Sequence, residues 1–272
     1  MRVRCASLLL AACLVLIGCA SPLARTEAIA RAATAQRFIL AGGGFRLLAY
    51  YGAGFAASSR LHIYIDHDGR PWRGRQVSDD PTPHDPLALR LMVQDRTPAL
   101  YLGRPCHFGL DPRPPCNAWL WTHGRYGEEV VAAMAGAITA FVRERGFGEL
   151  VLIGHSGGGT LAVLLAERLE RTVALVTLAA NLDIDAWAAM HGYTPLAGSL
   201  NPASRAPLPP SIAQLHYVGS ADRNVPPALV RDYARRQAAA PVVEVPGFDH
   251  ACCWVSAWPE LLERAPLRKP GR

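Results

Sequence analysis

The sequence predicts an α/β domain in which helices cover both faces of a mostly parallel β-sheet. From about residue 38 onward, short apolar segments alternate with segments whose apolar residues recur at helical spacing. The segment 150–153 is wholly apolar, as expected of a strand at the centre of a parallel sheet. Half of the 272 residues are apolar and 18% are charged, which suits one large core and excludes global disorder.

The expected elements follow in chain order, beginning with a hairpin around the glycines at 42–44. Strands are expected at 38–41, 45–50, 61–65, 99–102, 150–153, 173–178, 215–218 and 242–245. Helices are expected over 85–94, from 130 to Gly146, over 160–169, from Pro226 onward and over 252–262. Residues 183–210 interrupt this rhythm with prolines, glycines and asparagines, and they predict a short cap inserted between core elements.

The charge balance is mildly basic, with 28 basic and 22 acidic residues and a formal net charge of +6. The sequence has no run of five or more basic residues and no basic stripe with interleaved aromatic residues. We therefore expect no nucleic-acid partner.

The N-terminus resembles an export signal. Arg2 and Arg4 precede the apolar run 8–17, which is shorter than the roughly 20 residues that a membrane-spanning helix needs. The sequence Leu16-Ile17-Gly18-Cys19 resembles the lipobox of bacterial lipoproteins, in which the cysteine is lipidated and becomes the new N-terminus.

This resemblance implies a signal peptide over 1–18 and lipidation of Cys19. A tether over 19–37 and the α/β domain over 38–272 are expected to follow. The protein would then be anchored in the bacterial cell envelope, at the periplasmic face of the outer membrane, and would meet the membrane through its lipid. The alternative is an ordinary signal peptide or an uncleaved anchor, with Cys19 incidental.

The remaining cysteines suit an oxidising compartment. Cys106 and Cys116 flank a proline-rich loop, and a disulfide between them is expected. The adjacent pair Cys252-Cys253 is compatible either with a buried free thiol or with a local disulfide. The sequence contains no C-x-x-C, so its cysteines predict no zinc site.

The segment Gly154-His155-Ser156-Gly157-Gly158 fits the G-x-S-x-G pattern of a nucleophile elbow, and it lies between a buried strand and a helix. In such a tight turn the residues two before and two after the serine must be nearly without side chains, while the serine hydroxyl is exposed. The N-terminus of the following helix favours negative charge at this point. The pattern predicts Ser156 as a nucleophile, whereas the pentapeptide by itself also fits a strand–helix turn with a capping serine.

A serine nucleophile needs a base to take its proton and an acid to orient that base. His250 is the one histidine that follows a strand in a turn late in the chain, and Asp222 ends the strand before it. Asp249 is a competing acid, but its adjacency to His250 hinders it from reaching the far ring nitrogen. Asp183 or Asp185, one strand earlier, is the other competitor.

With these motifs the region 38–264 resembles the α/β-hydrolase superfamily. The resemblance rests on the elbow, on Gly219-Ser220-Ala221-Asp222-Arg223-Asn224-Val225-Pro226 and on Gly247-Phe248-Asp249-His250. It implies an eight-stranded sheet and two-step acyl transfer by Ser156, His250 and Asp222 without a cofactor.

One segment departs from the pattern of that superfamily. Where many members carry His-Gly after the third strand, this sequence reads Asp66-His67-Asp68-Gly69. By position, the Asp68 amide would complete the oxyanion hole with the Gly157 amide, and a shifted turn would use His67 or Gly69 instead. The Asp68 carboxylate would oppose an oxyanion unless it points away.

No known metal-binding spacing matches His62 together with Asp66, His67 and Asp68, so no metal is expected.

The expected activity is hydrolysis of an ester on a small-molecule or lipid acyl substrate. The alternatives are a peptidase or thioesterase of the same fold, and a non-catalytic envelope lipoprotein.

Overall fold

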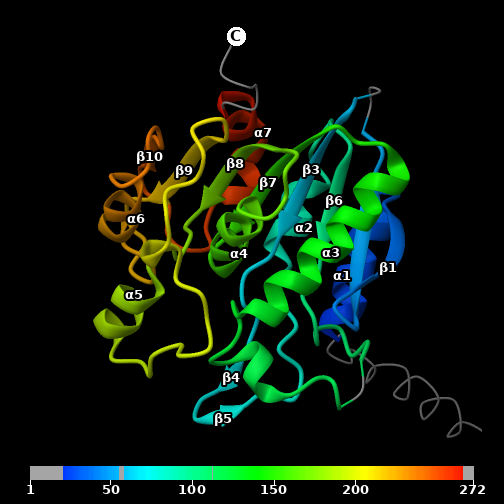
Figure 1. The fold of residues 1–272 in the computed structure, drawn as a ribbon, viewed down its shortest axis with the longest axis horizontal. Helices are drawn as coiled ribbons and strands as arrows, with labels where there is room; N and C mark the ends of the chain where they lie inside the picture. The colour runs from blue at the N-terminus through cyan, green and yellow to red at the C-terminus, as the bar shows by residue number, and fades with distance from the viewer. Residues whose placement is uncertain (1–20, 55–57, 112, 266–272) are drawn as a thin grey trace, which may run out of the picture.

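The computed structural model describes residues 21–54, 58–111 and 113–265. An eight-stranded sheet forms its centre, in the order β1-β2-β6-β3-β7-β8-β9-β10 (Figure 1). The pairs β1–β2 and β2–β6 are antiparallel and all other neighbours in this sheet are parallel. The strands are β1 (Gln36–Gly42), β2 (Phe45–Gly52), β3 (Arg60–Ile65), β6 (Ala99–Leu102), β7 (Glu149–His155), β8 (Thr172–Leu178), β9 (Ala213–Gly219) and β10 (Val242–Val245).

Helices cover both faces of the sheet. One core cluster holds buried residues of α3, α4 and α6, and the other holds buried residues of α1, α2 and α7. In Figure 1, α3 and α4 lie in front of the sheet. The helices are α1 (Pro22–Ala32), α2 (Leu87–Met92), α3 (Glu128–Arg145), α4 (Gly157–Ala166), α5 (Ile184–His191), α6 (Pro227–Ala234) and α7 (Trp254–Arg264).

The alternation of side chains along β7 explains why this strand is wholly apolar. Leu150 and Leu152 belong to the core beneath α3 and α4, while Val151 and Ile153 belong to the opposite core. Successive residues of a strand point to opposite faces, so a strand covered on both faces needs apolar residues throughout. The predicted α/β-hydrolase fold is confirmed, with every expected strand present and boundaries shifted by a few residues.

A two-stranded hairpin of β4 (Trp72–Arg73) and β5 (Gln76–Val77) was not predicted from the sequence. Its strands are two residues long and exposed, so they carry no alternation of apolar and polar residues. It projects at the lower edge of the molecule in Figure 1.

The segment 19–37, predicted as a tether that could include a short helix, contains such a helix in its described part. Residues from Pro22 onward fold into α1, which is capped by Ser21, and β1 begins at Gln36. Thr26 and Ala30 are buried, and Ala30 joins the core cluster of α2 and α7. Two buried small side chains in eleven residues give a weak sequence pattern, which explains why the sequence did not reveal this docking.

The predicted signal peptide 1–18 and the predicted lipidation site Cys19 lie outside the described residues. Within the described residues, none of the helices has the length and apolar character needed to cross a membrane.

The structure joins Cys106 and Cys116 in a disulfide, with Cα atoms 5.4 Å apart. It also joins the adjacent Cys252 and Cys253, the local bond that the sequence left open.

Removing the first disulfide with the double variant Cys106→Ser, Cys116→Ser is expected to lower the melting temperature modestly. The bond closes a loop of ten positions that prolines already restrict in the unfolded chain, so its loss should cost less than about 3 kcal/mol. Differential scanning calorimetry measures this loss, and peptide mapping without reductant checks the bond itself. Two alkylatable thiols in the native protein would contradict the prediction.

Two buried histidines, His107 and His216, predict a loss of stability at acidic pH. Burial lowers the pKa of each to about 4 from the ordinary value of 6.5. His216 is fully buried, with its Nδ1 2.8 Å from the Thr177 hydroxyl. In the unfolded chain each of these two imidazoles takes up a proton below pH 6.5, whereas in the folded protein it does so only near pH 4.

Stability should therefore be fully present above pH 6.5 and should fall between pH 6.5 and 4, by up to about 1.4 kcal/mol per pH unit for each histidine. Urea unfolding at pH 7, 6 and 5 measures the slope. The variant His216→Gln should reduce that slope, and an unchanged slope would contradict the assignment.

Candidate active site

Ser156 lies between β7 and α4 and adopts φ 53° and ψ −123°, a backbone conformation that L-residues rarely adopt. The turn is held by the Ser156 amide, which donates to Leu178 O at 2.9 Å. A Cβ at Gly154 would overlap the backbone of Gly158, and one at Gly158 would overlap Ile65 O. Both glycines are therefore required by close backbone approach, as the G-x-S-x-G pattern predicts.

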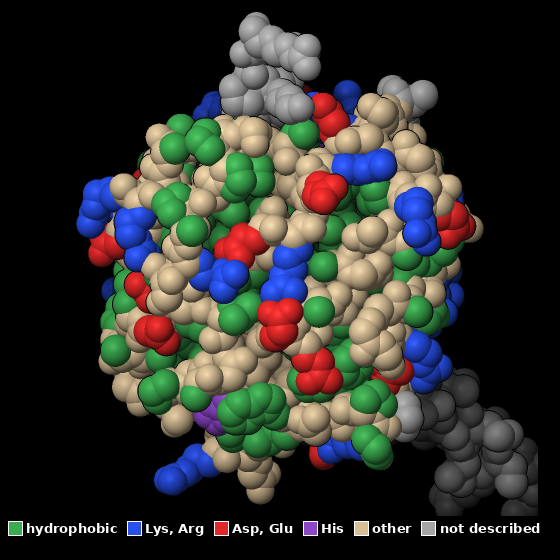
Figure 2. All heavy atoms as spheres, in the orientation of Figure 1, with side chains coloured by type: hydrophobic (Ala, Val, Ile, Leu, Met, Phe, Trp, Pro, Cys, Tyr) green, Lys and Arg blue, Asp and Glu red, His purple; other side chains and the backbone are tan. Residues whose placement is uncertain are grey.

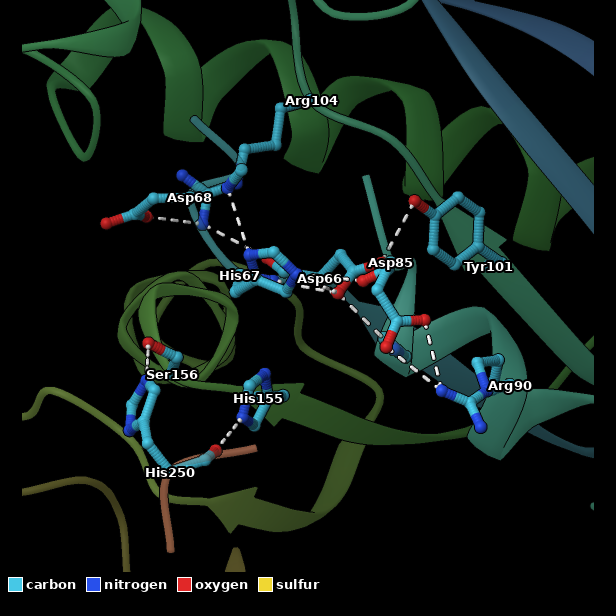
Figure 3. Close-up of polar contacts among 12 residues, drawn as sticks. Asp66, His67, Asp68, Asp85, Arg90, Tyr101, Arg104, His155, Ser156 and His250 are labelled. Atoms are coloured by element: carbon cyan, nitrogen blue, oxygen red, sulfur yellow. Dashed lines mark hydrogen bonds and ion pairs between the residues drawn. The ribbon is translucent and has the colours of Figure 1, made fainter. Parts of the chain in front are cut away.

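The structure brings Ser156, His250 and Asp222 together. His250 Nε2 lies 2.9 Å from Ser156 Oγ, and His250 Nδ1 lies 2.9 Å from Asp222 Oδ2. Figure 3 shows the His250 ring directed at the Ser156 hydroxyl. Because an ionised carboxylate only accepts, Nδ1 carries the proton and Nε2 is left to accept from the serine.

Asp222 is buried and held in place by its own turn. Its Oδ1 accepts from the amides of Asn224 and Val225, both at 2.9 Å, so Oδ2 is free to face His250. Asp249, the adjacent competitor, is exposed and accepts from the amides of Ala251 and Cys252 instead.

The two earlier competitors are also engaged elsewhere. Asp183 caps α5 by accepting from the Ala186 amide, and Asp185 accepts from Asn201. Among these four carboxylates, Asp222 is therefore the one that reaches the imidazole.

His155 supports the position of His250. It is buried, and its Nε2 donates to the backbone carbonyl of His250 at 2.8 Å (Figure 3). Burial and the neighbouring charge of His250 hold the pKa of His155 well below its ordinary value, so this side chain is neutral. No motif in the sequence indicated this hydrogen bond.

The Asp68 carboxylate is bound by three side chains from a distant part of the chain. Arg104 Nη2 lies 2.9 Å from Oδ1, Arg125 Nη1 donates to Oδ2 at 3.0 Å, and the Tyr126 hydroxyl donates to Oδ2 at 2.6 Å. Burial raises the pKa of Asp68, but the two arginine charges and the Tyr126 hydroxyl outweigh burial and leave this pKa well below its ordinary value. Figure 3 shows Arg104 extending to Asp68.

This ion-pair group lies beside the candidate nucleophile, Ser156. A Cβ at Gly157 would overlap Asp68 Oδ1 and the Tyr126 hydroxyl, so only glycine fits there. Within the described part of the chain, the amides of Asp68 and Gly157 donate no hydrogen bond, which leaves both able to bind an oxyanion. Their assignment as the oxyanion hole stays a prediction. Sequence reasoning missed Arg104, Arg125 and Tyr126, because no motif marks them.

A cavity of about 320 Å³ opens at Ser156. Trp187 of α5 lines it, and its Nε1 donates to Asn224 O at 3.0 Å, so the predicted cap segment supplies part of the wall. The other residues at its mouth include His67, Gly69, Pro71, Asn181 and Ala251.

The residues considered as metal ligands have other partners. His62 Nδ1 lies 2.6 Å from Asp95, and Asp66 accepts from the amides of His67 and Ala88. Over the ranges that the structure describes, no three His, Cys, Asp or Glu side chains are placed to hold a metal ion.

The sequence matches no protein-family model and no curated protein. Its structure is similar to several solved structures. One is an α/β serine hydrolase without lid from Xanthomonas campestris, with 17% identity and a TM-score of 0.56 over 86% of this chain and 96% of that chain. Another is an α/β serine hydrolase homologue from Coxiella burnetii, with 14% identity and a TM-score of 0.58 over 84% and 94% of the two chains.

A third similar structure is an esterase from Pyrococcus furiosus, with 10% identity and a TM-score of 0.58 over 85% of this chain and 90% of that chain. These similarities establish that the chain has the α/β-hydrolase fold.

Proposed function

We propose that this protein is a serine hydrolase that cleaves an ester of a small-molecule or lipid acyl substrate. The observation that carries the proposal is the continuous hydrogen-bonded chain Ser156–His250–Asp222 at the carboxyl ends of the strands. The esterase among the similar structures supports an ester as the bond cleaved. Peptidase and thioesterase activities would use the same three residues.

In the proposed reaction, Ser156 Oγ attacks the ester carbonyl carbon as His250 Nε2 takes the serine proton. The amides of Gly157 and Asp68 bind the resulting oxyanion, and Asp222 stabilises the imidazolium. His250 then gives its proton to the leaving alcohol as the carbon–oxygen bond breaks. Water, deprotonated by His250, attacks the acyl-enzyme and releases the acid and free Ser156.

A fluorophosphonate probe followed by a substrate panel tests this proposal. Labelling at Ser156 and turnover of 4-nitrophenyl esters would support it, and the same panel should include thioesters and amides of the same acyl groups. Absence of both labelling and turnover would instead favour the non-catalytic alternative.

We further propose that Cys19 is lipidated and anchors the protein in the bacterial cell envelope, on the strength of the lipobox-like Leu16-Ile17-Gly18-Cys19. The variant Cys19→Ser should remain unprocessed or soluble, because the modification needs a thiol. Mass spectrometry of the protein isolated from a bacterial host measures the N-terminus, and an unmodified N-terminus at another residue would refute the anchor.

A further inference from the structure

A second, larger cavity of about 700 Å³ adjoins the cavity at Ser156. Pro71, Arg125 and Trp187 line both cavities, so the two lie next to each other. The larger one lies between the β4–β5 hairpin and the loop after α5, and its walls include Trp72, Arg75, His123, Tyr193 and Leu196. A substrate bound at Ser156 would extend into this space.

The cavity walls carry an excess of positive charge. Among the described residues that line the two cavities, Asp68 supplies the one carboxylate, and it is already paired with Arg104 and Arg125. One carboxylate and two guanidinium groups leave this buried group with a net positive charge. Arg75 adds a second positive charge and forms no ion pair within the described part of the chain.

Arg125 also has unused hydrogen-bonding capacity. Its side chain is 8% exposed, its Nε donates to Thr122 O at 2.7 Å and its Nη1 donates to Asp68. Its Nη2 has no hydrogen-bond partner among the described residues, although the side chain lines both cavities. A guanidinium edge of this kind binds a carboxylate or phosphate oxygen well.

Aromatic rings border these charges. Trp72 packs edge-on against His123 with ring centroids 6.1 Å apart, and Trp187 packs edge-on against Tyr193 at 5.2 Å. Figure 2 shows a basic side chain projecting from the lower edge of the molecule, with hydrophobic and histidine side chains beside it, in the region of the β4–β5 hairpin. Apolar walls lower the effective dielectric constant, which strengthens the attraction between a bound anion and the arginines.

We propose that the substrate carries an anionic group, a carboxylate or a phosphate, away from the bond that is cleaved, and that Arg75 and Arg125 bind this group in the larger cavity. The inference rests on the proposed function and names its substrate class. An anion suits these walls because they offer unpaired donors and positive charge but no free carboxylate.

Two pairs of esters, each an anionic carboxylate and its methyl-ester counterpart, test the inference. The first pair, mono-4-nitrophenyl glutarate and 4-nitrophenyl methyl glutarate, places the charge on the acyl side. The second pair, 4-acetoxybenzoate and its methyl ester, places the charge on the alcohol side. For one pair or both, we expect kcat/KM to favour the anionic ester by about tenfold, with a preference that shrinks as salt is added.

The variant Arg75→Gln identifies the group responsible. It should remove most of this preference by lowering kcat/KM for the anionic esters far more than for their neutral partners, and it should still fold because Arg75 is exposed on the β4–β5 hairpin. Arg73→Gln is the matched control, since Arg73 is exposed on the same hairpin but lines neither cavity.

Three results would overturn the inference. Equal or lower kcat/KM for both anionic esters in the wild-type protein would do so, and so would a preference that survives Arg75→Gln. In either case, turnover of the neutral esters and labelling of Ser156 would leave the proposed hydrolase function intact. Failure of all four esters together with absence of labelling would refute that function and this inference with it.

Discussion

Replacing Ser156 with alanine is expected to abolish fluorophosphonate labelling and to lower kcat/KM for ester hydrolysis by about 10⁴-fold or more. The change removes the candidate nucleophilic oxygen, which lies 2.9 Å from His250 Nε2, whereas the Tyr126 hydroxyl in the same cavity is bound to Asp68. The oxyanion hole and substrate binding would still provide a residual rate above that of water.

The fold of this variant should be nearly unaffected. The turn at Ser156 is held by backbone hydrogen bonds to Leu178 and from Gly159, which do not involve the hydroxyl. Alanine has a Cβ as serine does, so it adopts the φ of 53° with no more backbone strain than serine. We expect the free energy of unfolding to change by less than about 0.5 kcal/mol, measured by urea unfolding.

Ser256→Ala serves as the control, because this exposed hydroxyl on α7 donates only to its own helix and should be replaceable without loss of activity. Undiminished hydrolysis by Ser156→Ala would remove Ser156 from the mechanism. Loss of labelling together with a large fall in the melting temperature would show a folding defect instead.

Asp222→Asn is expected to lower kcat by about 10³- to 10⁴-fold. Asparagine can still accept from the amides of Asn224 and Val225 through Oδ1, so the turn should survive. Its amide group would then present N–H to His250 Nδ1, which would have to accept. The imidazole would carry its proton on Nε2 and could no longer take the proton of Ser156.

Asp249→Asn is the matched control for this variant. Asp249 precedes His250 directly and accepts from the amides of Ala251 and Cys252, a role that the asparagine oxygen can keep. Its kcat should change by less than about threefold, as for a surface substitution. Steady-state kinetics on one 4-nitrophenyl ester compares the two, and a large loss in Asp249→Asn with little loss in Asp222→Asn would reverse the assignment of the acid.

Local sequence patterns were enough to locate the strands of the eight-stranded sheet and most of the helices that cover it. The run 150–153 is wholly apolar because its strand is buried throughout. The apolar residues before Gly146 recur at helical spacing because that helix is buried along one side. Gly154 and Gly158 were predictable for a similar reason, since the clashes that require them arise largely within one strand–turn–helix unit and with the neighbouring strand. The sequence thus determined Ser156 as the candidate nucleophile and His250 as its candidate base.

Spacing alone did not decide the acid. Asp222, Asp249 and Asp183 each follow a strand; the sequence favoured Asp222, and in the structure the distance of 2.9 Å from Asp222 Oδ2 to His250 Nδ1 distinguishes it. That distance depends on how the β9 and β10 loops meet at the edge of the sheet, which neither loop encodes alone.

Only the tertiary structure revealed what surrounds the candidate nucleophile. Arg104 and Arg125 reach Asp68 from loops that lie far from it in sequence, and the larger cavity forms between the β4–β5 hairpin and the loop after α5. Ion pairs and cavity walls of this kind impose no periodicity on any single segment. The docking of α1 on the core depends likewise on two small buried side chains, Thr26 and Ala30, of which Ala30 belongs to the core cluster that includes α2 and α7. The sequence by itself therefore determined the strands of the main sheet and the nucleophile elbow, because short-range sterics and burial set each of them. The tertiary structure decided the charge around Asp68, because the contacts that create it exist only once the chain has folded.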